Sequence, residues 1–196
     1  MEKIHNTKDK ILKLLLSHKK EEFTIRAISK NVAIDYKTVY FIVKDLIQNN
    51  VIQAKKAGQT ILCSINQKQF NADIFRAELL RKEELLQNKN FYALYNYFKD
   101  LKEPFFILLL FGSYASGKPR KKSDIDLMLI VNDEKVKTQV KYIASLIPLD
   151  IHLVDFTSEE FLAMLKTTEF IVGKEAFYNN IILLGIEDYY RITEHA

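Results

Sequence analysis

The stretch that decides the fold is residues 111–131, FGSYASGKPRKKSDIDLMLIV. It places Asp124 and Asp126 one residue apart at the head of the apolar run 127–131. Such a run predicts a buried strand, where two carboxylates are costly unless a cation lies between them. Because side chains alternate along a strand, both aspartates face the same side, with Cα atoms about 6.5–7 Å apart. This spacing suits carboxylates that share one or two hard cations, and oxygen-only ligands favour Mg²⁺.

A glycine and a serine precede the aspartates, directly after a second predicted buried strand at 105–111. Gly112 allows the backbone to approach a ligand closely, and the Ser113 hydroxyl can hold phosphate oxygens together with the N–H groups of a short helix. The connecting segment is basic, and its cations either neutralise a polyphosphate or only keep the loop solvated: Lys118, Arg120, Lys121 and Lys122.

A third carboxylate is expected on the next predicted strand, 148–156. Alternation places Asp150 and His152 on one side of this strand. Asp150 is the candidate carboxylate that binds the metal ion next to the attacking nucleophile. Asp155 is its rival, and a plain surface position for Asp150 is the alternative; His152 is more typical of a polar neighbour than of a ligand. Together these residues fit attack of a hydroxyl on the α-phosphate of a nucleoside triphosphate (NTP), with pyrophosphate leaving.

The order hydrophobic-Gly-Ser, a spacer of ten residues, then Asp-hydrophobic-Asp resembles the signature of the DNA polymerase beta-like nucleotidyltransferase superfamily. The resemblance covers about residues 89–155 and is greatest to the minimal nucleotidyltransferases. It implies Gly112 and Ser113 at the triphosphate and Asp124 and Asp126 on Mg²⁺. Asp150 would take the third-carboxylate role. It further implies two Mg²⁺ ions and an NTP, with ATP as the first candidate.

The N-terminal third is basic. Residues 1–66 hold 12 Lys and Arg against 6 Asp and Glu, whereas the remaining 130 residues hold 17 against 19. This surplus favours a nucleic-acid contact. A helical period begins at Thr7, and Thr24 and Asp35 are N-cap candidates for two further helices. Two strands around Gly58 follow.

Three helices and a hairpin with a basic tip resemble the winged helix-turn-helix domain, over residues 5–66. The resemblance implies a helix in the major groove of duplex DNA and a hairpin near phosphates. The expected contacts are Tyr36, Lys37, Thr38, Tyr40 and Lys44 on the helix, and Lys55 and Lys56 on the hairpin. Phe41 shares the exposed helix face and needs a partner, either DNA or another subunit. A module that makes only protein contacts is the alternative.

The chain is therefore predicted to be of the α+β class, with three parts. These are a winged helix-turn-helix domain at 1–66, a linker helix at 67–88 that could pair in a homodimer, and a mixed-sheet nucleotidyltransferase domain with flanking helices at 89–196. Only short helices are expected after Asp155, which leaves little room to bind an acceptor. The single cysteine and the absence of a membrane-length apolar run or a cleavage site favour a cytoplasmic protein.

Two functions follow as hypotheses. The first is an enzyme that moves a nucleoside monophosphate from an NTP to a hydroxyl. The resemblance to antitoxin nucleotidyltransferases implies a tyrosine of a HEPN-type toxin as the acceptor, and a small-molecule acceptor stays open. The second is a transcriptional regulator whose nucleotidyltransferase domain is a nucleotide sensor or an inert scaffold. Both could coexist in an antitoxin that represses its own operon.

Overall fold

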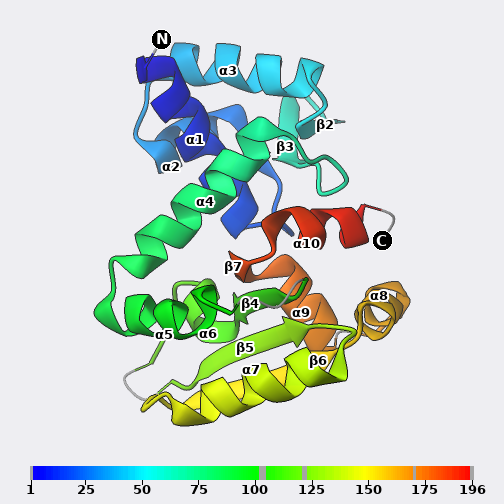
Figure 1. The fold of residues 1–196 in the computed structure, drawn as a ribbon. Coiled ribbons are helices and arrows are strands. Elements are labelled where there is room, and N and C mark those ends of the chain that lie inside the picture. The colour runs from blue at the N-terminus through cyan, green and yellow to red at the C-terminus, as the bar shows by residue number, and fades with distance from the viewer. Residues whose placement is uncertain (1, 102–104, 121–122, 170, 195–196) are drawn as a thin grey trace. The chain divides into compact units, whose positions relative to one another are not determined.

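The computed structural model describes residues 2–101, 105–120, 123–169 and 171–194. Its contacts divide the chain into two compact units, Met1–Leu80 and Arg81–Ala196. The division falls inside one helix, α4 (Ala72–Leu86) (Figure 1). The structure combines helices with two small sheets, which agrees with the expected α+β class.

The first unit contains three helices and a three-stranded antiparallel sheet. Its elements are α1 (Glu2–Ser17), β1 (Phe23–Thr24), α2 (Ile25–Val32), α3 (Tyr36–Gln48), β2 (Ile52–Ala57) and β3 (Thr60–Ile65). The strand order is β1-β3-β2, so the short strand before α2 pairs with the far arm of the hairpin. Gly58 turns the hairpin with φ +60°.

Local capping explains where α2 and α3 begin. The Thr24 hydroxyl accepts a hydrogen bond from the Ala27 N–H at 3.1 Å, and the Asp35 carboxylate accepts one from the Thr38 N–H at 2.9 Å. Both predicted N-caps are confirmed. Four apolar residues of α3 are buried on one side of the helix: Val39, Ile42, Val43 and Leu46. Cys63 of β3 is fully buried, and burial raises the pKa of its thiol to about 11.

The linker differs from the predicted helix at 67–88. The Asn71 side chain accepts from the Ile74 N–H at 3.0 Å and caps α4, which therefore begins only at Ala72. The first turns of α4 belong to the first unit, because Asp73 and Arg76 form ion pairs with α1. Asn88 then caps a separate helix, α5 (Lys89–Lys99), which begins where the linker was expected to end.

The second unit is built on a four-stranded mixed sheet of order β6-β5-β4-β7. Its remaining elements are β4 (Ile107–Phe111), α6 (Gly112–Ala115), β5 (Ile125–Ile130), α7 (Glu134–Leu146), β6 (Ile151–Phe156), α8 (Ser158–Lys166), α9 (Val172–Tyr178), β7 (Asn180–Leu184) and α10 (Ile186–Thr193). The pairs β4–β5 and β4–β7 are antiparallel, whereas β5 and β6 are parallel and joined through α7. Thr157 caps α8 in a capping box with Glu160.

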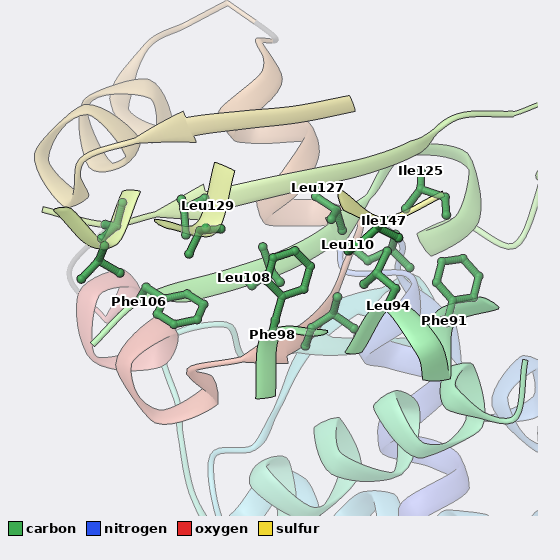
Figure 2. Close-up of a cluster of buried hydrophobic side chains, with 14 residues drawn as sticks. Phe91, Leu94, Phe98, Phe106, Leu108, Leu110, Ile125, Leu127, Leu129 and Ile147 are labelled. Atoms are coloured by element: carbon green, nitrogen blue, oxygen red, sulfur yellow. The ribbon is translucent and has the colours of Figure 1, made fainter. Parts of the chain in front are cut away.

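Alternation gives the two faces of this sheet different roles. One face packs against α5 and α7 in a cluster of buried apolar side chains (Figure 2). Leu127 and Leu129 of β5 point into this cluster, as do Leu108 and Leu110 of β4. Asp126 has the opposite parity in β5 and therefore faces away from the cluster.

One strand of the second unit was not predicted. After Asp155 the sequence suggested only helices, but β7 follows α9 and pairs with β4 along Leu108–Phe111. Its apolar segment 180–184 is too short for a buried helix and ends at Gly185, which has φ +77°. In the described part of the chain, no helix combines the length and the apolar character that crossing a bilayer requires.

Candidate active site and nucleic-acid surface

The centre of the candidate active site is the turn between β4 and α6. Gly112 lies at this turn with φ +69°, a conformation that L side chains rarely adopt. A Cβ atom placed on Gly112 would lie 2.3 Å from Oδ2 of Asp126. The glycine therefore does two things here: it allows the turn, and it leaves room for the carboxylate.

Asp126 is held between this turn and the neighbouring strand. Its Oδ1 lies 3.3 Å from Nδ1 of His152, its register partner in the parallel pair β5–β6. The Asp126 side chain is 27% exposed and that of His152 is 62% exposed. The imidazole thus borders the carboxylate at an accessible edge, as expected for the polar neighbour that the sequence indicated.

Asp124 and Asp150 lie at the start of the same strand pair. The Ile125 N–H donates to the Asp150 carbonyl at 2.8 Å, which extends the β5–β6 ladder up to these residues. Both aspartates are exposed. Their parity matches that of Asp126 and His152, so all four residues lie on one face of the sheet, at the end where β4 leads into Gly112.

Asp155 lies on the other face of β6, toward α7. Its carboxylate forms ion pairs with Lys137, at 3.2 Å, and with Lys141. Burial opposes its ionisation, but the hydrogen bonds from Lys141 and Lys137 outweigh this and hold the pKa of Asp155 below its usual value. The two candidates for the third carboxylate therefore differ in surroundings. Asp150 is exposed on the sheet face that carries Asp126, whereas Asp155 forms ion pairs with two lysines.

The segment after α6 returns toward Ser113. The Lys118 N–H donates to the Ser113 carbonyl at 2.9 Å, and the Arg120 N–H donates to the Ser123 hydroxyl at 2.8 Å. The side chains of Lys118 and Arg120 are exposed. Lys121 and Lys122 lie outside the described residues. Two of the expected basic residues thus lie in a short loop that connects the serine to the aspartates.

Within the described ranges, no three His, Cys, Asp or Glu side chains gather closely enough to hold a metal ion. Magnesium in proteins is commonly bound by one or two carboxylates, with substrate phosphates and water completing its six ligands. Asp126 and Asp124, two residues before it, supply such a partial set of ligands. Among the described residues, the Asp126 carboxylate pairs with His152. These donors fit Mg²⁺ that arrives with a triphosphate.

In the first unit, α3 presents an aromatic and basic surface. Tyr36 and Phe41 are 49% and 60% exposed, and Lys37 and Lys44 are exposed as well. The rings of Tyr36 and Tyr40 stack with centroids 6.0 Å apart, and Lys44 Nζ lies 5.1 Å from the Tyr40 centroid. Thr38 is half-buried and its backbone N–H serves the cap of the helix.

The two hairpin lysines leave β2 on opposite faces, since they are consecutive strand residues. Lys56 pairs with Ile61 of β3, and Lys55 pairs with Leu62. A pocket of about 430 Å³ adjoins Ile61 and includes residues that the sequence did not indicate. Its lining comes from three segments: Thr24, Ile25, Arg26, Tyr36, Tyr40, Gln59, Thr60 and Ile61. No local pattern signals such a site, because folding alone brings these segments together.

Comparison with known protein families agrees with this geometry. Residues 93–181 match the family model described as Polymerase beta, Nucleotidyltransferase. The matched range begins in α5, ends in β7 and includes Gly112, Ser113 and the three candidate aspartates. No curated protein and no solved structure matches the chain. The match supports a polymerase beta-type nucleotidyltransferase domain in the second unit.

Proposed function

We propose that the second unit is a Mg²⁺-dependent enzyme that transfers a nucleoside monophosphate from an NTP, ATP first among them, to a hydroxyl group. The observation that carries this proposal is the position of Asp126. Its carboxylate fills the space that Gly112 leaves open and borders an exposed edge of the sheet, inside the range that matches the nucleotidyltransferase family.

The proposed roles follow from these positions. Ser113, at the start of α6, contacts the triphosphate, and Lys118 and Arg120 offset its charge from the adjoining loop. Asp124 and Asp126 hold Mg²⁺. With Asp150 as the third carboxylate, the full site binds two Mg²⁺ ions. When bound, Mg²⁺ neutralises phosphate charge and makes the acceptor hydroxyl more acidic. The acceptor oxygen attacks the α-phosphorus in line, the bond to the bridging oxygen breaks, and pyrophosphate leaves.

Asp150 is the proposed third carboxylate, which accepts the proton of the attacking hydroxyl. Asp150 is exposed on the sheet face that carries Asp126, which supports this role. The two lysine partners of Asp155 argue against Asp155 as the third carboxylate. A carboxylate that already accepts hydrogen bonds from two cations is a poor proton acceptor.

The proposed acceptor is a protein, with a tyrosine of a HEPN-type toxin as the specific candidate. The helices and the strand after β6 are short, from seven to nine residues in the helices and five in β7. Elements of this length are compatible with an acceptor that a partner protein presents.

We also propose that the first unit binds duplex DNA through α3 and its hairpin. The exposed Tyr36, Lys37 and Lys44 support this, as do the basic surplus of residues 1–66 and the order of the helices and hairpin. In the alternative function, DNA binding is the main activity and the second unit only senses a nucleotide or serves as a dimerisation scaffold.

Label transfer tests the enzyme directly. The protein is incubated with Mg²⁺ and each α-labelled NTP, alone and with the product of the neighbouring gene. We expect label on the acceptor with the unaltered protein and none with Asp124→Asn/Asp126→Asn. Asp100→Asn is the matched control, because Asp100 is an exposed carboxylate outside the site. If no NTP gives label while DNA still binds, the regulator is the better account.

A further inference from the structure

The pocket of the first unit has the size of a small-ligand site, since such sites commonly span about 300–1,000 Å³. It opens where the starts of α2 and α3 meet the turn between β2 and β3, three segments that Figure 1 shows in the same unit. Two of its lining side chains are the stacked tyrosines, Tyr36 and Tyr40.

The tyrosines offer the pocket a flat π surface. Tyr40 already contacts the ring of Phe41 and the ammonium group of Lys44, whereas Tyr36 has Tyr40 as its ring neighbour within the described part of the chain. At 49% exposure, Tyr36 can stack on a further planar group. Ile25 and Ile61 add apolar walls.

The charge of the pocket favours an anion. Arg26 is the charged member of the lining, and none of the lining residues is a carboxylate. Its guanidinium forms no hydrogen bond or ion pair with the described residues, so its donors are available. Arg26 lies in the first turn of α2, where the helix dipole also favours negative charge. Lys56 projects from the same hairpin face as its register partner Ile61.

We propose that this pocket binds a nucleotide unit, with the base stacked on Tyr36 and the phosphate at Arg26. Gln59 offers an amide that can donate to and accept from the edge of a base. The unit can be a free nucleotide or an unpaired nucleotide in a single strand. A base inside a duplex is stacked between its neighbours and does not fit this description. The inference does not depend on nucleotidyl transfer, because every lining residue belongs to the first unit.

Fluorescence of 2-aminopurine, which is quenched when the base stacks, tests the proposal. The full chain carries Asp124→Asn/Asp126→Asn and is kept in EDTA, so that the candidate active site does not bind the probe. Three probes are compared: 2-aminopurine ribonucleoside monophosphate, a single DNA strand with one internal 2-aminopurine, and the same strand in a duplex. We expect saturable quenching with the free nucleotide, the single strand or both; the probe that saturates identifies the source of the unit.

Matched variants connect the signal to the pocket. Tyr36→Ala and Arg26→Ala should each weaken binding about tenfold, the size of one lost stacking or phosphate contact, and Tyr36→Phe should retain it. Tyr92→Ala removes a tyrosine of similar exposure on α5, and Lys30→Ala removes an exposed cation on α2 outside the pocket; neither should change binding.

Three results would overturn the proposal: no saturable quenching, quenching only with the duplex, or quenching that Tyr36→Ala and Arg26→Ala leave unchanged. Duplex binding is measured in the same samples by anisotropy of a second dye. If duplex binding fails while quenching persists, the DNA-binding part of the proposed function is wrong and the nucleotide pocket stands.

Discussion

Gly112 and Gly117 have the same φ of +69° in different surroundings. A Cβ atom on Gly112 would meet the Asp126 carboxylate, whereas one on Gly117 would find no atom within 4 Å. Alanine at either position has to adopt the left-handed backbone. Only at position 112 does it also take the space of a functional group. The pair therefore separates backbone strain from the effect on the site.

We predict that Gly112→Ala and Gly117→Ala each lower the free energy of unfolding by about 1 kcal/mol, the cost of left-handed backbone for an L residue. Only Gly112→Ala should also reduce nucleotidyl transfer, by about a hundredfold or more, because the Asp126 carboxylate has to turn away. Urea unfolding and label transfer measure the two effects. Equal transfer by both variants would show that the Asp126 position does not matter.

Single residues whose role is local could be read from the sequence. Thr24 and Asp35 cap helices through backbone N–H groups three residues ahead, so the pattern alone identified them. The parity of Asp150 and Asp155 was also readable: an odd separation puts them on opposite faces of one strand. The two lysine partners of Asp155 were not, because they come from α7.

At the scale of elements, Asp150 and Asp155 lie on opposite faces of the sheet at β6, and only Asp155 pairs with lysines of α7. The pKa of Asp155 is lowered in the folded state from an unfolded value of about 3.9. Its pairing with Lys137 and Lys141 therefore stabilises the fold above that unfolded value. The contribution is lost as pH falls through the lower folded pKa.

We predict that Asp155→Asn lowers the urea midpoint at pH 7 and has a smaller effect near pH 3, because that pH lies below the unfolded pKa and part of the stabilisation is already lost. Transfer should persist in Asp155→Asn and be lost in Asp150→Asn, because only Asp150 lies on the face of Asp126. The midpoint is followed by circular dichroism at both pH values. Loss of transfer in a folded Asp155→Asn, with transfer kept in Asp150→Asn, would reverse the assignment.

Elements that depend on distant partners were harder to predict. The run at 125–130 is apolar enough to indicate a buried strand by itself. The segment of β7 is short and was missed, since its identity depends on pairing with β4, about 70 residues away in sequence. The start of α4 at Ala72 rather than at 67 depends on the Asn71 cap, a weak signal inside a sequence that otherwise favours helix.

At the scale of the molecule, the proposed activities occupy separate units. Lys37 and Lys44 belong to α3 of the first unit, and the candidate aspartates belong to the second. We predict that Lys37→Glu/Lys44→Glu abolishes duplex binding, because two cations become anions at the proposed phosphate contacts. Nucleotidyl transfer should be unchanged. Electrophoretic mobility shift and label transfer on the same sample provide the measurement.

Lys10→Glu/Lys30→Glu is the control for total charge, since both lysines are exposed on other helices of the same unit. It should weaken duplex binding far less than the α3 pair. A loss of transfer in a folded α3 variant would contradict the assignment of the two activities to separate units.

The contact between Gly112 and Asp126 limits how this protein can diverge. The space is sufficient for a carboxylate at 126 or for a side chain at 112, but not for both. A lineage that keeps the proposed reaction is expected to keep glycine at position 112. A lineage that has abandoned it can first lose the aspartate and then acquire a larger residue in place of the glycine. Among descendants, the identity of residue 112 would therefore record whether selection for catalysis has ended.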